Sequence, residues 1–366
     1  MARQSLAEVL PDFPWNSLLP AKKRASAHPD GLINLSVGSP VDPVAPGIQL
    51  TLAESGQASG YPQTVGTPQL RAAIKESLAR RYNIPQVEGI LPVVGTKEAI
   101  AWLPTLLGCR GKIVIPTVAY PTYEVGALLA GAQPIRSDTP WDVDDPDTID
   151  LIFINSPSNP TGRVLSPEEL RQLITFARAH DIIVASDECY LGLVWEGEAM
   201  SILDERISHN DHRNLLAIHS LSKTSNLASY RAGFLAGADN IIAELTETRK
   251  HAGLMVPGPI QAAMVTALAD DDQEALQKLR YARRRTVLLT ALLHAGFQVE
   301  ESSAGLYLWA TRREDCWTSV EWFAERGILV APGSFYGPTA TPFVRLALTA
   351  TDQDIDSAAR RLDIAS

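Results

Sequence analysis

The sequence predicts an α/β protein, with a large domain built on a mostly parallel seven-stranded sheet and a smaller α+β domain. From about residue 90, short apolar runs alternate with amphipathic helical stretches, which is typical of a parallel sheet wrapped by helices. Several of these runs are apolar almost throughout, as expected for strands buried on both faces. The predicted strands are 91–94, 112–115, 133–136, 150–154, 182–185, 215–218 and 232–236.

Capping residues mark the starts of the helices between these strands. Ser166 is an N-cap serine, followed by Pro167 at the first helical position and by Glu169, which completes a capping box. Thr67 and Pro68 start another helix in the same way. These signals place a helix before the first strand and another between the fourth and the fifth.

The pattern changes after about residue 256, where long helices precede short strands near 306–310 and 344–348. We therefore predict three parts. Residues 1–44 form an N-terminal arm and part of the small domain, residues 45–255 form the large domain, and residues 256–366 form the small C-terminal domain.

Composition excludes several functional classes. The 366 residues carry a formal charge of −10 and no basic stripe, which argues against nucleic-acid binding. No stretch is apolar for the roughly 18 residues of a membrane span, and the N-terminus lacks the apolar segment of a signal peptide. Three separated cysteines predict neither disulfides nor a metal site, and His209 and His212 lack a third ligand nearby. A cytoplasmic location without membrane attachment is expected.

One segment, residues 220–231, contains the most specific signal in the chain. Lys223 follows an apolar strand, with hydroxyl groups at Ser220 and Ser222 before it and Arg231 after it. Such a lysine can form a Schiff base, and the hydroxyls and arginine can hold a phosphate, as pyridoxal phosphate requires. A surface lysine in a serine-rich loop is the alternative.

Other strands also end in polar residues, and open α/β sheets bind ligands at these strand ends. A glycine turn into a helix, Gly95-Thr96-Lys97, offers free backbone N–H groups to a phosphate. Tyr120 offers a ring that can stack on a planar cofactor. Asn159 lies in a turn with two prolines, where a purely structural role is equally plausible. Asp187 and Tyr190 follow a buried strand and are costly to desolvate unless paired.

The motifs occur in the order Asn159-Pro-Thr-Gly, Asp187-x-x-Tyr190, Ser220-x-Ser-Lys223 and Arg231. This series resembles that of the fold-type I pyridoxal-phosphate-dependent aminotransferases of class I/II. The resemblance implies that Lys223 binds the cofactor covalently and moves a proton, and that Asp187 pairs with the pyridine nitrogen. Asn159 and Tyr190 would contact the phenolic oxygen. Tyr120 would stack on the ring, and the phosphate would be surrounded by Ser220, Ser222, Arg231, Gly95, Thr96 and Lys97.

The same resemblance implies a substrate site and a homodimer. Arg345, in Phe343-Val-Arg-Leu-Ala347, resembles the arginine that binds the substrate α-carboxylate, assisted by the N–H of Gly38 and by Asn159. Tyr61 resembles the tyrosine that reaches the phosphate of the neighbouring subunit. The partners would be small amino and keto acids and a second copy of the chain.

The substrate is implied by a narrower resemblance. Asn226, where the wider family has glycine, together with the segments 34–43 and 186–192, is similar to actinobacterial succinyldiaminopimelate aminotransferases. This implies transfer of an amino group between glutamate and N-succinyl-2-amino-6-oxopimelate, in diaminopimelate and lysine biosynthesis. The candidates for binding the distal carboxylates are Lys22, Lys23, Arg24, Lys97, Asn226, Lys250 and Tyr336.

Several alternatives remain at this point. Phe13 and Trp15 are either a lid over the site or packing anchors of the N-terminal arm. Another aminotransferase specificity (aspartate, aromatic or alanine) is the nearest alternative function. A pyridoxal-phosphate-dependent C–S lyase is more distant, because the same cofactor residues serve β-elimination. A cofactor-binding regulatory domain is disfavoured, because Lys223 and Arg345 are both present.

Overall fold

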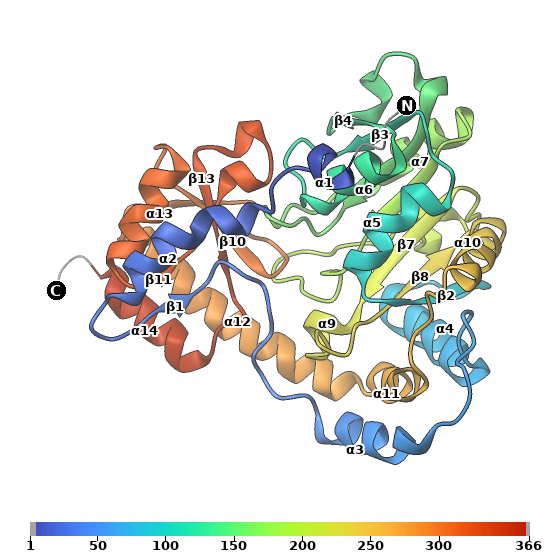
Figure 1. Ribbon diagram of the computed structural model, residues 1–366, viewed down its shortest axis with the longest axis horizontal. Helices are drawn as coiled ribbons and strands as arrows, with labels where there is room; N and C mark the ends of the chain where they lie inside the picture. The colour runs from blue at the N-terminus through green and yellow to red at the C-terminus, as the bar shows by residue number, and fades with distance from the viewer. Residues whose placement is uncertain (1–4, 364–366) are drawn as a thin grey trace.

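The computed structural model describes residues 5–363 and contains the predicted seven-stranded sheet (Figure 1). The strand order is β2-β8-β7-β6-β5-β3-β4, and only β8 runs antiparallel to its neighbours. Every predicted strand is confirmed, and so is the mostly parallel α/β class. The strands are β2 (Gly89–Val94), β3 (Lys112–Ile115), β4 (Gln133–Arg136), β5 (Ile149–Asn155), β6 (Ile183–Asp187), β7 (Leu215–Ser220) and β8 (Ala232–Gly237).

Four strands continue beyond their predicted ends, β8 by the single residue Gly237. β5, β6 and β7 extend through Asn155, Asp187 and Ser220, because the ladder of backbone hydrogen bonds persists after the apolar pattern stops. Asn155 pairs with Asp187 in the register of β5 and β6. The polar residues predicted to follow the strands are thus partly the last residues of the strands themselves, which fixes their backbone positions.

Helices cover both faces of this sheet and give three layers. Side chains alternate between the two cores: Ile152 and Ile154 face one hydrophobic cluster, and Leu151 and Phe153 face the other. The first cluster is closed by α3 (Pro46–Glu54), α4 (Pro68–Tyr82), α7 (Pro167–Ala179) and α11 (Gly258–Ala269). The second is closed by α5 (Thr96–Leu106), α6 (Thr122–Ala130) and α10 (Asp239–His251).

Both helix starts that the sequence predicts are confirmed. The Thr67 side chain accepts from the Leu70 N–H at the start of α4. At α7 the Ser166 hydroxyl accepts from the Glu169 N–H while the Glu169 carboxylate accepts from the Ser166 N–H, which completes the capping box.

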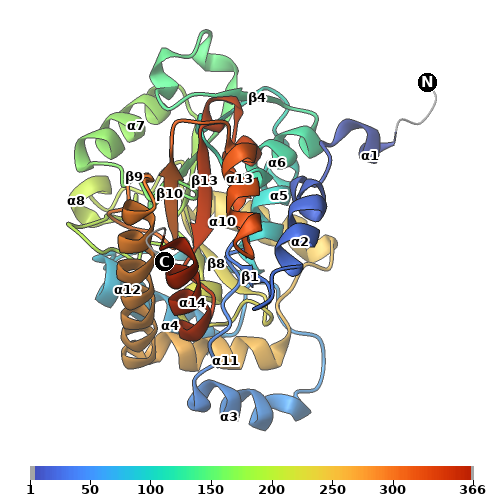
Figure 2. The same ribbon diagram turned by 90° about the vertical axis from the view of Figure 1, so that its left-hand side faces the viewer.

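A smaller unit packs beside the large sheet, on the left of Figure 1. It contains a four-stranded antiparallel sheet, ordered β12-β13-β10-β9, and a two-stranded pair of β1 and β11. The strands are β1 (Ile33–Asn34), β9 (Gln298–Glu300), β10 (Tyr307–Thr311), β11 (Ile328–Leu329), β12 (Ala331–Pro332) and β13 (Phe343–Ala347). The helices are α2 (Leu19–Ser26), α12 (Asp271–His294), α13 (Cys316–Glu325) and α14 (Asp352–Leu362), grouped in Figure 2.

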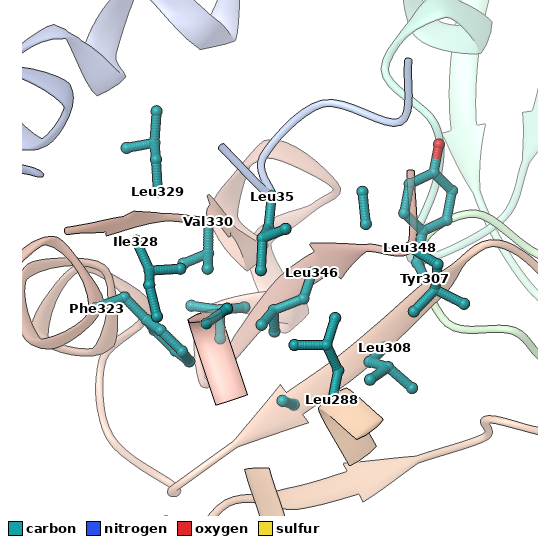
Figure 3. Packing of buried hydrophobic residues seen from close by; sticks show 14 of the residues in the cluster. Leu35, Leu288, Tyr307, Leu308, Phe323, Ile328, Leu329, Val330, Leu346 and Leu348 are labelled. Carbon is teal, nitrogen blue, oxygen red and sulfur yellow. The ribbon is translucent and has the colours of Figure 1, made fainter. Parts of the chain in front are cut away.

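The core of this smaller unit is assembled from both ends of the chain. Leu35 lies among side chains of the C-terminal strands, including Val330 and Leu346 (Figure 3). Leu18 and Ala21 of the N-terminal segment belong to the same cluster. The N-terminal arm therefore packs on the unit that the C-terminal residues form, because it supplies part of that unit's hydrophobic core.

The division into three domains stays a prediction, and its first four and last three residues lie outside the described part of the chain. Val256 and Met264 lie on the C-terminal side of the predicted boundary at residue 256, yet they pack in the core of the large sheet together with Ile74 of α4. The long helix α12 then leads from the large unit into the small one (Figure 1).

The remaining elements are short. They are α1 (Leu6–Val9), α8 (Glu205–Ser208), α9 (Leu221–Thr224), η1 (Pro14–Leu18), η2 (Ser55–Gln57), η3 (Pro140–Asp142), η4 (Pro146–Thr148), η5 (Gly333–Phe335) and η6 (Pro338–Ala340). No helix within residues 5–363 has the length and apolar character needed to cross a bilayer.

A buried arginine joins α12 to both ends of the small unit. Arg284 donates to the Asp42 carboxylate at 2.6 and 2.8 Å and to Asp352 at 2.6 Å. Burial raises the pKa of Asp42, but hydrogen bonds from Arg284 and Gln277 outweigh it and hold that pKa below its ordinary value. The two carboxylates and the guanidinium therefore stabilise each other.

Replacing Arg284 with alanine is expected to lower the free energy of unfolding by about 3 kcal/mol, because it leaves Asp42 half-buried without its counter-charge. Urea denaturation at neutral pH measures the loss. Arg283→Ala is the matched control, since the neighbouring Arg283 pairs with Asp356 at the surface and should cost less than about 1 kcal/mol. Equal losses in the two variants would contradict the assignment.

Candidate active site

One cavity lies where the carboxyl ends of the large sheet's strands meet the small unit. Most residues singled out from the sequence line it, although they are spread over more than 300 positions of the chain. Its lining residues are Phe13, Trp15, Val37, Gly38, Thr96, Lys97, Ile100, Tyr120, Asn159, Asp187, Cys189, Tyr190, Ser220, Ser222, Lys223, Ala228, Arg231, Tyr307 and Arg345.

Lys223 lies in the short helix α9, directly after β7. Its ammonium group donates to the carbonyl oxygen of Gly38, which the N-terminal arm carries into the cavity. Burial lowers the pKa of Lys223, because the charged form is desolvated. A larger fraction of neutral amine, and hence greater nucleophilicity, follows from this environment.

Asp187 is a buried carboxylate without a cationic partner among residues 5–363. Its oxygens accept from the Tyr123 hydroxyl at 2.7 Å and from the Cys189 N–H at 3.2 Å. Burial raises the pKa of Asp187, and these hydrogen bonds oppose the rise. A carboxylate in this position is suited to a cationic N–H group of a ligand, such as the protonated nitrogen of a pyridine ring.

Cationic and hydroxyl groups gather on the other side of Lys223. Arg231 donates to the Ala228 carbonyl at 2.8 Å, and the exposed Lys97 side chain lines the same cavity. Burial lowers the pKa of Lys97, and the positive charge of Arg231 adds to the effect. Two cations in one wall of a cavity, without a carboxylate paired to either among the described residues, favour an anion.

The turn at Gly95 shapes this wall. Gly95 has a φ of 76°, and a Cβ atom there would lie 2.2 Å from the Arg231 guanidinium, so a larger residue would be strained and would displace Arg231. Thr96 begins helix α5, whose first N–H groups are free to bind an anion. Ser220 and Ser222 line the same cavity. The arrangement fits a phosphate group.

Arg345 presents a second buried cation, from strand β13. Its guanidinium donates to the Asn159 side-chain oxygen at 2.8 Å and to the Ser36 carbonyl at 2.7 Å, and it stacks on the Tyr307 ring at 3.9 Å. No carboxylate is paired with it in the part of the chain that the structure describes. This arginine is thus oriented by neutral groups and suited to a carboxylate ligand.

Three tyrosines complete the cavity. The hydroxyls of Tyr190 and Tyr307 lie 3.2 Å apart, and burial raises the pKa of Tyr190 well above its ordinary value. Burial also raises the pKa of Tyr120 to about 12. Tyr120 and Tyr190 are therefore protonated at neutral pH, and both can donate hydrogen bonds.

Several contributors were not found from the sequence. Tyr307 comes from β10, where Trp309 pairs with Arg345, and the alternation of side chains puts Tyr307 on the same face. Tyr123 reaches Asp187 from helix α6. Neither contact leaves a local motif. Phe13 and Trp15 line the cavity. The Trp15 ring also packs on the Phe335 ring, with the centroids 5.3 Å apart.

Some candidate residues lie elsewhere. Gly95 shapes the wall without lining the cavity, and Tyr61 is 97% exposed. Lys22 and Lys23 are on the exposed face of α2. The third basic residue there, Arg24, pairs with Glu321 and Glu325 of α13.

The remaining candidates for distal carboxylates are also placed away from the cavity. Lys250 is on the exposed side of α10 and lies near Glu247. Tyr336 is fully buried behind Arg345. Asn226 donates to the Gln277 side chain at 2.9 Å. Its φ of 57° is left-handed, which explains why asparagine can replace glycine at this position.

Fold and site together define a pyridoxal-phosphate-dependent enzyme: a buried lysine, an unpaired carboxylate and an anion cradle lie at the strand ends of this sheet. The chain belongs to the family of class I and II aminotransferases, whose model matches residues 30–362. It is therefore a transaminase that uses pyridoxal phosphate.

Named relatives agree with this assignment. The chain is 55% identical to a probable aminotransferase, Rv1178, of Mycobacterium tuberculosis over 99% of this chain and 87% of that protein. It is 50% identical to the 4-dedimethylamino-4-oxo-anhydrotetracycline transaminase OxyQ of Streptomyces rimosus, over 96% of this chain and 99% of OxyQ. A solved aminotransferase structure from Neisseria meningitidis superposes with a TM-score of 0.89 at 27% identity, over 98% and 99% of the two chains.

Proposed function

We propose that Lys223 holds the cofactor covalently and that Asp187 pairs with its ring nitrogen. The support is geometric: both side chains are buried in one cavity, and Asp187 has no cation of its own. Asn159 and Tyr190 are placed on the same side of the cavity as Arg345 and are assigned to the phenolic oxygen. Tyr120 is assigned to the face of the ring.

The phosphate is assigned to the cationic wall. Thr96 supplies the free N–H groups at the start of α5, and Ser220 and Ser222 supply hydroxyls. Arg231 supplies the positive charge, with Lys97 beside it. Because these groups would otherwise be unpaired, a bound dianion stabilises the wall as well as being held by it.

Pyridoxal phosphate, when bound, supplies an electron sink for the charge that develops when a substrate loses its α-proton. The protein's part is to orient the substrate and to move that proton. Arg345 binds the α-carboxylate, and Gly38 lies next to the Lys223 amine. Lys223, whose pKa is lowered by burial, accepts the α-proton and returns it.

Lys223→Ala is expected to abolish steady turnover, because both the covalent anchor and the proton carrier are lost. Steady-state release of 2-oxoglutarate from glutamate and a keto-acid acceptor measures it. Lys250→Ala serves as the control, since Lys250 is exposed on α10 and should leave turnover unchanged. Full activity in the Lys223 variant would disprove the assignment.

We propose that the substrates are glutamate and N-succinyl-2-amino-6-oxopimelate, interconverted in diaminopimelate and lysine biosynthesis. The observation behind this proposal is that one cavity holds two separate cations, Arg345 and Lys97, neither paired with a carboxylate among residues 5–363. Arg345 serves the α-carboxylate. Lys97, which contacts the Phe13 ring at 5.3 Å, is placed to serve a more distant carboxylate as well as the phosphate.

A second candidate is supported by the similarity to OxyQ, whose name describes a transaminase of an oxo-anhydrotetracycline. Such an acceptor is a bulky ketone. Phe13 and Trp15, which border the cavity, offer apolar and aromatic surface for a ring system. The two candidates differ in whether the distal part of the acceptor is anionic or aromatic.

A panel of acceptors with glutamate as donor separates these functions. The succinylated keto acid is expected to give the highest kcat/KM, and Lys97→Met is expected to raise its KM by about tenfold, the loss of one charged contact. A short keto acid, tested on the same variant, controls for damage to the phosphate site. Preference for a polycyclic ketone would favour the second candidate, and release of pyruvate or ammonia would indicate a lyase.

A homodimer is proposed because Tyr61 projects from the surface with 97% of its area exposed. Leu50 of α3 is also exposed, and large exposed tyrosine and leucine side chains are typical of an interface. Sedimentation equilibrium is expected to give about twice the 39.7 kDa of the chain, and Tyr61→Ala is expected to weaken cofactor binding without dissociating the dimer. A monomer with full cofactor affinity would contradict the proposed homodimer.

A cytoplasmic location is likewise proposed, and cell fractionation tests it.

A further inference from the structure

A pair of buried titratable side chains lies behind the cavity and takes no part in the roles described above. The carboxylate oxygen Oε2 of Glu188 lies 3.3 Å from Nε2 of His219. The two side chains are 1% and 6% exposed. Neither of these two atoms has a hydrogen-bond partner among the described residues, so their mutual contact is the one pairing that this part of the chain offers to either atom.

Both side chains are held rigidly toward each other. The second oxygen of Glu188, Oε1, accepts from the Ser186 hydroxyl and from the Ile202 N–H, each at 2.8 Å. The imidazole ring of His219 is stacked between Tyr82 and Phe234, with ring centroids 5.4 and 5.1 Å away. Rotation of either group away from the other would therefore break existing contacts.

The surroundings favour a single shared proton over an ion pair. All donors to Glu188 are neutral, and no lysine or arginine within residues 5–363 is paired with it. Burial raises the pKa of Glu188 to about 7 and lowers the pKa of His219 to about 3. Both neutral forms are thereby favoured around pH 6, and a protonated carboxyl donating to a neutral imidazole satisfies both atoms.

Other titratable groups face the pair from neighbouring elements. Arg81 and Glu274, from α4 and α12, are paired with each other at 2.6 Å, so their charges largely compensate. The remaining groups around the same small cavity and strand end are Tyr82, Cys189 and Asp187. Among these, Asp187 is the charge nearest in sequence, and its ionisation further disfavours a second charge on Glu188.

The location connects the pair to the cofactor site. Glu188 directly follows Asp187 at the end of β6, and His219 directly precedes Ser220 at the end of β7. The Glu188 N–H also donates to the Ile218 carbonyl at 3.0 Å. The side-chain contact thus ties together the two strand ends that carry Asp187 and Ser220.

We propose that Glu188 and His219 share one proton and act as a positioning pair, which keeps Asp187 the ionised carboxylate of this strand end and fixes its place relative to Ser220. The proton-sharing part stands on its own geometry. The positioning part rests on the proposed cofactor roles of Asp187 and Ser220.

The first test compares Glu188→Gln with the unchanged protein in thermal unfolding from pH 5 to 8.5, with and without pyridoxal phosphate. Glutamine keeps a donor for His219 and an acceptor for Ser186, but it cannot ionise. The native carboxyl has its pKa raised from 4.5 to about 7, so its stabilising effect is lost as the pH rises through that range. The thermal unfolding midpoint of the variant, relative to that of the unchanged protein, is expected to rise by a few degrees as the pH increases from 5 to 8.

While His219 stays neutral in both proteins, its own titration cancels in this difference, and the two proteins should start nearly equal at pH 5. An ion pair would raise the pKa of His219 only in the unchanged protein, so the variant would be clearly less stable at pH 5 and its deficit would shrink toward pH 8. Glu98→Gln is the matched control for loss of an ion pair, since Glu98 pairs with the permanently charged, buried Arg249 at 2.7 and 3.1 Å and its deficit should persist to pH 8. A difference that does not vary with pH would also overturn proton sharing.

The second test measures the dissociation constant of pyridoxal phosphate at pH 7 by equilibrium dialysis. Glu188→Ala removes the side-chain contact with His219 and is expected to weaken cofactor binding by about tenfold. The dissociation constant of Glu188→Gln should stay within about threefold of that of the unchanged protein. His219→Phe keeps the ring stacking but removes Nε2, and it replaces the alanine variant if that variant does not fold. Unchanged cofactor binding in Glu188→Ala and in His219→Phe would overturn the positioning role.

Asp187→Asn separates failure of this inference from failure of the proposed function. If Asp187 does not serve the cofactor, that variant binds pyridoxal phosphate normally, while the pH-dependent stability difference of Glu188→Gln persists. If only the proton-sharing pair is wrong, Asp187→Asn still loses cofactor affinity and the stability difference is absent.

Discussion

Burial of charged side chains without counter-charges in the chain is the constraint on which this structure depends. Asp187 and Arg345 are buried and converge on one cavity, yet neither of them has an opposite charge paired to it among residues 5–363. Each is held by neutral hydrogen bonds instead, as the Tyr123 contact to Asp187 illustrates. Such an arrangement costs stability in the free protein, and a ligand carrying a cationic ring and an anionic phosphate offsets that cost. The site is therefore shaped as the complement of a cofactor and a carboxylate substrate.

The same constraint explains how the two units are joined. Arg345 extends from the small sheet to Asn159 of the large one, and Lys223 contacts Gly38 of the N-terminal arm. Tyr190 and Tyr307 meet across the same boundary. Because each contact crosses between the units, any shift of one against the other changes the positions of the substrate-binding and proton-transferring groups together. Arg345, the proposed substrate-binding residue, is thus mechanically linked to the opposite unit of the cavity.

Two adjacent acidic residues have different roles because their surroundings differ. Asp187 and Glu188 are neighbours at the end of β6, and burial raises both pKa values. Asp187 faces the cavity, where a bound cation can stabilise its ionised form. Glu188 faces the interior and meets His219, where only a shared proton satisfies both groups. Alternation of side chains along the chain sends the two carboxyls in different directions, so identical chemistry yields one ligand-binding acid and one structural acid.

The sequence by itself determined the order of strands and helices, the caps of α4 and α7, and the strand-end residues from Asn159 to Arg231, because these depend on local periodicity and on motifs whose spacing is fixed along the chain. It could not find Tyr307 or the partnership of Glu188 with His219, since those follow from register between distant strands. It also included Asn226 among the candidates for the distal carboxylates, whereas in the tertiary structure this side chain hydrogen-bonds to Gln277. Only the tertiary structure decides which polar groups are buried together, because that depends on how elements far apart in the chain pack. Burial in turn sets the pKa values and the ligand preferences of these groups.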